Sequence, residues 1–140
     1  RDVAVTGVQT CALPILKEVG FGDWEGRTAE ELQCDDPDRV FEFKRDPVGR
    51  RPPGAEVLAD FHARAVAAYE ALLARHAGGH VLVVAHAGLM RMVICHVLGL
   101  PAAHAYRLNV ASAGMARIQV EQRDARRLDT LQWLSAGPTR

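Results

Sequence analysis

The stretch Val81-Leu82-Val83-Val84-Ala85-His86-Ala87-Gly88 decides the expected fold. Its first five residues form a short, continuous apolar run with β-branched side chains, which indicates a strand buried on both faces, as in a parallel sheet. Apolar residues then recur at helical spacing as far as Val97, and Gly99 ends the helix. A buried strand that passes directly into a helix is typical of α/β proteins, so the sequence predicts three layers, with helices on both faces of a mostly parallel sheet.

The residues before this stretch predict helices. Apolar side chains from Glu56 to His76 fall at helical spacing, and Gly78-Gly79 provides a stop. Thr28 and Glu31 have the spacing of a capping box, which predicts a short helix after Thr28. A second short helix is expected from Pro37 until Asp46-Pro47, because the residue before a proline avoids the helical conformation.

The remaining segments are expected to be a loop and two strands. Residues 50–54 are rich in proline and are expected to form an exposed loop. Residues 116–122 and 128–134 predict two further strands, joined by a charged turn at residues 123–127.

Length and composition limit the possible classes of protein. The 140 residues suffice for one domain, 49% of them are hydrophobic, and the formal net charge is +0. We therefore expect no nucleic-acid partner and no membrane partner, because there is neither a basic excess nor a long apolar run. The 3 cysteines form no C-x-x-C pair, which fits a reducing, cytoplasmic location. The sequence does not indicate an oligomeric state.

The first fifteen residues are expected to be foreign to the fold. The string from Val5 to Ile15 resembles the translation of a common sequencing-library adapter, so residues 1–15 are interpreted as a non-native scar. The alternative is a natural strand followed by a loop that ends in proline. On the first interpretation, residues 16–140 are the C-terminal part of a single domain.

The junction at His86-Ala87-Gly88 is the strongest candidate site. Ligands of open α/β sheets bind beyond the carboxyl ends of the strands, where the following helix presents free N–H groups and a partial positive charge that suit a phosphate. Gly88 allows a ligand to approach the backbone closely, and His86 could hydrogen-bond a phosphoryl oxygen. The alternative is that His86 is a core histidine whose hydrogen bonds are satisfied.

Glu18 is the second candidate, because a carboxyl group among apolar side chains suits a general acid at neutral pH. The alternative is an ordinary solvated glutamate. Phe21 and Trp24, which lie nearby in the sequence, are expected to pack against other side chains instead of contacting a ligand.

Four motifs, taken in order, resemble the histidine phosphatases, the phosphoglycerate-mutase-like superfamily. They are Glu18-x-x-Phe21-Gly22-x-Trp24-Glu25-Gly26, Asp46-Pro47, Pro52-Pro53-Gly54-Ala55-Glu56 and Val81 to Gly88. The resemblance extends from Leu16 to Ala136. Within the family, the first three motifs look most similar to the α-ribazole-5′-phosphate phosphatases of cobalamin synthesis.

The resemblance implies a reaction and roles for the candidate residues. A nucleophilic histidine in an Arg-His-Gly motif takes the phosphoryl group from a small phosphate ester, and water then hydrolyses the phosphohistidine. Glu18 would be the acid and later the base. His86 would hold the phosphate, together with the N–H groups of Ala87 and Gly88. The family requires no metal and no cofactor.

The sequence departs from the family in its front part, because no Arg-His-Gly motif is present. Arg75-His76-Ala77-Gly78 is similar, but it is expected at the end of a helix, whereas the nucleophile must follow a strand. The first strands of the fold are therefore expected to be missing, and the chain as written is expected to be inactive. The alternatives within the family are a phosphoglycerate mutase or a broad-specificity sugar phosphatase. The alternative from another class is a non-catalytic α/β module that binds phosphate or nucleotides.

Overall fold

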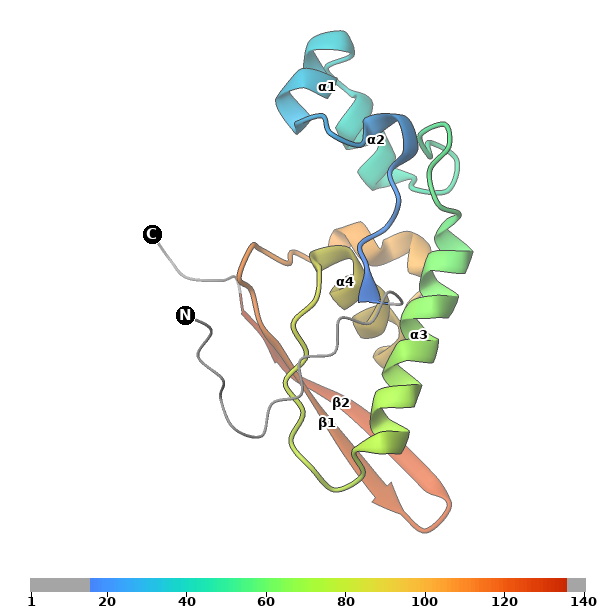
Figure 1. Ribbon diagram of the computed structural model, residues 1–140, viewed down its shortest axis with the longest axis vertical. Helices are drawn as coiled ribbons and strands as arrows, with labels where there is room; N and C mark the ends of the chain where they lie inside the picture. Colours follow the sequence, from blue (N-terminus) through green and yellow to red (C-terminus); the bar gives the residue numbers. More distant parts are fainter. Residues whose placement is uncertain (1–15, 136–140) are drawn as a thin grey trace, which may run out of the picture.

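The computed structural model describes residues 16–135. Figure 1 shows helix α3 along one side of the molecule, α1 and α2 at one end, and the two strands toward the other end. In chain order the elements are the 3₁₀ helix η2 (Gly22–Trp24), α1 (Ala29–Asp35), α2 (Arg39–Arg45), α3 (Leu58–Arg75), α4 (Ala87–Val97), the 3₁₀ helix η3 (Ala102–Arg107), β1 (Ala116–Arg123) and β2 (Arg126–Leu134).

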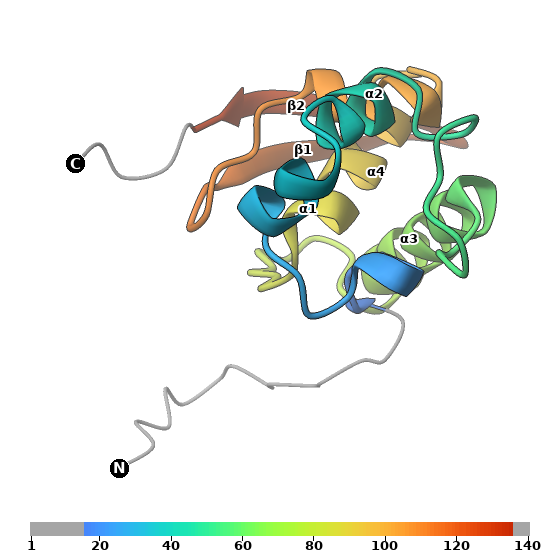
Figure 2. The same ribbon diagram turned by 90° about the horizontal axis from the view of Figure 1, so that it is seen from above.

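The core lies between α3, α4 and η3. Phe61 and Ala65 of α3, Met92 and Cys95 of α4, and Ala105 of η3 are each no more than 1% exposed. Figure 2 shows α3 and α4 side by side, with the strands on the far side of α4. The predicted stripe of apolar residues on α3 therefore packs against α4.

The two strands form a hairpin that is tied to α3. They pair antiparallel, from Ala116 opposite Leu134 to Arg123 opposite Arg126. Asp124 in the connecting turn has a φ of 56°, a conformation that aspartate tolerates better than most residues. The Tyr69 hydroxyl donates to Asp129 of β2 at 2.9 Å, and Arg127 donates twice to Glu70, at 2.6 Å each. Both predicted strands are confirmed, and both extend further into the charged turn than expected.

The strand predicted at Val81 to Ala85 is not present in the structure. This segment has no strand conformation, and Leu82 and Val84 are 77% and 86% exposed instead of buried. Within residues 16–135 the sheet has two strands, β1 and β2, and these are antiparallel. The predicted parallel sheet is therefore not confirmed within the described residues. An apolar run becomes a strand only when neighbouring strands accept and donate its backbone hydrogen bonds, and no segment within residues 16–135 pairs with it as a strand.

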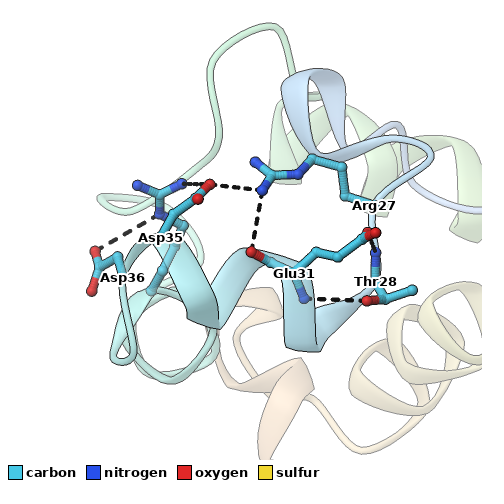
Figure 3. Close-up of polar contacts among 6 residues, drawn as sticks. Arg27, Thr28, Glu31, Asp35 and Asp36 are labelled. Carbon is cyan, nitrogen blue, oxygen red and sulfur yellow. Dashed lines mark hydrogen bonds and ion pairs between the residues drawn. The ribbon is translucent and has the colours of Figure 1, made fainter.

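The short helices begin and end where local chemistry places them. The Thr28 hydroxyl accepts from the Glu31 N–H at 3.2 Å, and the Glu31 carboxylate accepts from the Thr28 N–H at 2.8 Å, so the predicted capping box is confirmed (Figure 3). Arg27 also donates to Asp35 at 2.7 Å, across the length of α1. Helix α2 ends at Arg45, before Asp46-Pro47, as expected. The loop at residues 50–54 is exposed except for Pro52, which is buried.

Candidate functional site

The two sequence-predicted candidates meet at the beginning of α4. Oε2 of Glu18 accepts a hydrogen bond from the Gly88 N–H at 3.0 Å, although the two residues are 70 positions apart. Oε1 of the same carboxylate accepts from the Val19 N–H at 2.9 Å. A carboxylate at a helix N-terminus is stabilised by the helix dipole, typically by about 0.3–1 kcal/mol. The Glu18 carboxylate thus lies at the N-terminus of α4, where the sequence predicts a phosphate site.

The observed position of the Glu18 carboxylate depends on the absence of a side chain at Gly88. A Cβ atom at position 88 would lie 2.1 Å from Oε1 of Glu18 and 2.9 Å from its carboxyl carbon. The sequence attributed the glycine to the close approach of a ligand, but the group that approaches it in the structure is the Glu18 carboxylate. The Gly88 N–H that was predicted to bind phosphate is bonded to this carboxylate.

His86 precedes α4 as its N-cap residue, with an extended backbone. Its side chain is exposed, which does not fit the alternative of a core histidine. Ala87 is the first residue of the helix and is half-buried. An exposed imidazole beside the helix N-terminus is able to meet an anion from solvent, so the phosphate-binding roles of His86 and Ala87 remain predictions that the geometry permits.

An aromatic cluster lies next to the site and was only partly predicted. The ring of Phe43 packs edge to face against those of Phe21, Trp24 and Tyr106, with centroids 6.1, 5.3 and 4.9 Å away. Phe21 and Trp24 are therefore packing residues, as expected. Burial and the nearby negative charge of Glu18 raise the pKa of Tyr106 to about 12, against the influence of Arg91. The charge of Glu18 thus contributes to the environment of Tyr106, which no sequence pattern indicated.

The motifs at residues 18–26 and 52–56 pack directly against each other. Asp23 N–H donates to the Pro53 carbonyl at 3.1 Å, and Glu56 N–H donates to the Gly20 carbonyl at 2.8 Å. The Glu56 carboxylate in turn accepts from the Gly20 N–H at 3.2 Å and pairs with Arg64 at 2.7 Å. Sequence reasoning missed the role of Glu56 and Arg64. One signal in the sequence could have indicated this role. Arg64 is adjacent to Ala65, which is buried, and a cation close to buried residues needs an acidic partner.

Three other histidines lie in α3, at its C-terminal end, or in α4. His76 caps the C-terminal end of α3, so Arg75-His76-Ala77-Gly78 ends a helix as predicted. His62 and His96 face each other across α3 and α4, with ring centroids 6.3 Å apart, and burial together with His96 lowers the pKa of His62. Within the described part of the chain, no three His, Cys, Asp or Glu side chains are arranged to hold a metal ion. No helix between residues 16 and 135 is long and apolar enough to cross a membrane.

Fold and site define a protein of mixed helices and strands in which a glutamate side chain lies at the N-terminus of a helix and a histidine is the N-cap residue of that helix. A family model described as the histidine phosphatase superfamily (branch 1) matches residues 3–133. The chain belongs to this superfamily, as the resemblance predicted.

Individual relatives agree with the family. The bifunctional protein Rv2228c of Mycobacterium tuberculosis is 30% identical over 120 residues, which are 82% of this chain and 33% of that protein. The adenosylcobalamin/alpha-ribazole phosphatase of Escherichia coli is 26% identical over 113 residues, 81% of this chain and 56% of that protein. A native structure of the mycobacterial glucosyl-3-phosphoglycerate phosphatase Rv2419c has a TM-score of 0.74 and 26% identity, covering 89% of this chain and 64% of that one. The chain spans between a third and about half of the length of these two curated relatives.

Proposed function

We propose that this chain is part of a phosphomonoesterase that hydrolyses a small phosphate ester through a phosphohistidine intermediate. The observation that carries the proposal is the hydrogen bond from the Gly88 N–H to the Glu18 carboxylate at 3.0 Å. A carboxylate at the beginning of the helix that follows His86, where an anion is favoured, supports a proton-transfer role for Glu18. A module that only binds phosphate has no need of a carboxylate there, since the carboxylate repels the anion.

In this proposal each residue has a role set by its position. His86 and the start of α4 hold the phosphoryl oxygens. The nucleophilic histidine, supplied by the Arg-His-Gly segment of the family, attacks phosphorus while Glu18 gives its proton to the leaving oxygen. Glu18 then accepts a proton from the water that attacks the phosphohistidine, so inorganic phosphate leaves and the enzyme returns to its starting state.

For the substrate we favour α-ribazole 5′-phosphate. Support comes from the motifs at residues 18–26 and 46–56 and from the similarity to the adenosylcobalamin/alpha-ribazole phosphatase of Escherichia coli. The structural similarity to a glucosyl-3-phosphoglycerate phosphatase favours a sugar phosphate as the second candidate. A phosphoglycerate mutase is less well supported, because a mutase has to exclude water from the phosphoenzyme.

The substrate assignment is tested in the completed enzyme, meaning this chain with an N-terminal family segment, including its Arg-His-Gly motif, fused before Leu16. The experiment compares kcat/KM for α-ribazole 5′-phosphate, glucosyl-3-phosphoglycerate, fructose phosphates and 3-phosphoglycerate. We expect α-ribazole 5′-phosphate to be the best substrate and phosphate to be released. Mutase turnover above phosphate release contradicts the proposal, and equal hydrolysis of all four reduces it to a broad-specificity phosphatase.

The role of Glu18 is tested by Glu18→Gln in the same completed enzyme. General acid–base catalysis is typically worth about 10²–10⁴-fold in rate, so we expect a loss of that size for an alkyl phosphate. p-Nitrophenyl phosphate should lose less, because its leaving group departs without a proton. Equal losses on both substrates would mean that Glu18 is not the acid.

A further inference from the structure

Arg64 of α3 holds the backbone of the segment that carries Glu18. Its guanidinium group donates to the Lys17 carbonyl at 2.8 Å and to the Glu18 carbonyl at 3.0 Å. The same group donates to both carboxylate oxygens of Glu56, at 2.7 and 2.8 Å. One side chain thus connects α3 to two successive peptide units at the candidate acid.

Glu56 fixes the same segment from its other end. Its carboxylate accepts from the Gly20 N–H at 3.2 Å while its own N–H donates to the Gly20 carbonyl at 2.8 Å. Hydrogen bonds from Arg64 keep the pKa of Glu56 below its usual range despite partial burial, and the single hydrogen bond from the Gly20 N–H contributes less. Glu56 is therefore charged at neutral pH and offers Arg64 a fixed partner.

The arginine itself is anchored in the core. Its guanidinium carbon lies 4.5 Å from the centre of the Phe61 ring, and Phe61 is 0% exposed. The side chains of Arg64 and Glu56 are only 16% and 20% exposed. A bidentate arginine pair with little exposure holds its geometry far better than a surface ion pair does. The position of residues 17–20 is consequently set by the packing of α3.

We propose that Arg64, held by Glu56, is a positioning residue that directs the Glu18 carboxylate toward the beginning of α4. Hydrogen bonds link Arg64 to the beginning of α4 through Glu18. Arg64 donates to the Glu18 carbonyl, and the Glu18 carboxylate accepts from the Gly88 N–H. Loss of Arg64 releases the backbone, and the carboxylate no longer lies where the leaving oxygen needs its proton. This inference rests on the proposed function, since it concerns the same proton transfer.

The kinetic test uses Arg64→Met and Arg64→Lys in the completed enzyme. A misplacement of a reacting group by about 1 Å is able to cost about 10²-fold in rate, so we expect Arg64→Met to lose about that factor on an alkyl phosphate and clearly less on p-nitrophenyl phosphate. Arg64→Lys should recover only part of the loss, because an ammonium group cannot reproduce the planar fork. In the Glu18→Gln background, Arg64→Met should have almost no further effect on either substrate.

The matched control is Arg45→Met. Arg45 also pairs with a glutamate, Glu42, at 2.6 Å, but on the surface of α2 with 64% of its side chain exposed. The Arg45→Met variant of the completed enzyme should be as active as the unmodified enzyme. Equal losses on both substrates in Arg64→Met, together with unequal losses in Glu18→Gln, overturn the positioning role while leaving the proposed function intact. Equal losses already in Glu18→Gln overturn the proposed function instead.

A structural measurement does not depend on activity. In the 140-residue chain, the ¹H–¹⁵N signal of the Gly88 amide reports its bond to Glu18, and Glu18→Ala, which removes the acceptor, identifies the displaced position. Arg64→Met should move this signal toward the displaced position, whereas Arg45→Met should leave it in place. A Gly88 signal unchanged in Arg64→Met overturns the inference, whatever the kinetics show.

Discussion

At the scale of single residues, Gly88 and Glu18 depend on each other. Because Gly88 has no side chain, the Glu18 carboxylate has room to lie against its backbone. Gly88→Ala would put a Cβ atom 2.1 Å from Oε1 of Glu18. The Glu18 carboxylate is the flexible end of a side chain, so it moves away at little energetic cost. Alanine is also favoured over glycine inside a helix by about 1 kcal/mol. We therefore expect Gly88→Ala to keep or raise the melting temperature while the completed enzyme loses activity.

The loss in Gly88→Ala should resemble that of Glu18→Gln, with a greater effect on alkyl phosphates than on p-nitrophenyl phosphate. Gly79→Ala is the matched control, because a Cβ atom there meets its nearest neighbour, the His76 carbonyl, at an ordinary 3.5 Å. It should change neither activity nor stability. Full activity of Gly88→Ala on an alkyl phosphate would show that the contact between Glu18 and Gly88 does not matter for the reaction.

These residues also show which parts of the site a sequence reveals. Glu18 and His86 were predicted because each lies in a motif with its own local signature. Arg64 was not predicted, because its importance comes from meeting the Glu18 carbonyl 46 residues away. Tyr106 was missed for the same reason, since only the fold brings its ring against that of Phe43.

At the scale of elements, Gly22 allows the loop of residues 18–26 to lie on the loop of residues 52–56. Its φ is +57°, and a Cβ atom there would lie 2.2 Å from the Pro53 carbonyl oxygen and 2.4 Å from the Ala55 nitrogen. A left-handed conformation at a non-glycine residue costs about 1–3 kcal/mol, and the clash with backbone atoms adds to that cost. We expect Gly22→Ala to reduce the free energy of unfolding by about 2 kcal/mol or more, as measured by denaturant titration.

Gly26→Ala separates the cost of the left-handed conformation from the cost of the clash between loops. Gly26 has a similar φ of +77°, but a Cβ atom there meets nothing within 4 Å. This variant should show the conformational cost alone, so it should be clearly more stable than Gly22→Ala. If the two variants are equally destabilised, the close approach of the two loops is not what requires glycine at position 22.

The helices and the hairpin could be predicted from the sequence, whereas the strand predicted at Val81 to Ala85 is absent from the structure, and the difference is physical. The capping box at Thr28, the stop before Pro47 and the apolar stripe of α3 act within a few residues of chain, so the sequence contains them directly. The hairpin has a short turn and is nearly as local. The segment Val81 to Ala85 has the composition of a buried strand, but the hydrogen bonds of a parallel strand come from distant segments.

At the scale of the whole molecule, this segment leaves an apolar surface uncovered. Leu82 and Val84 are 77% and 86% exposed, and on the hairpin Leu128 and Trp133 are 61% and 43% exposed. Exposed apolar side chains on a segment without a paired strand favour pairing with another strand. The family resemblance implies that the first strand of the domain lies beside this segment.

Hydrogen exchange tests this expectation directly. In the 140-residue chain, the amides of residues 82–85 should exchange as quickly as those of an exposed loop, because no other described segment forms a strand pair with them. The amides inside α3 and those paired between β1 and β2 should be protected in the same sample and serve as internal controls. In the completed enzyme, the amides of residues 82–85 should become as protected as the hairpin, since a neighbouring strand then accepts their hydrogen bonds. Strong protection of residues 82–85 already in the 140-residue chain would mean that this segment is paired without the added strand, while continued fast exchange in the completed enzyme would mean that the predicted parallel sheet does not form there.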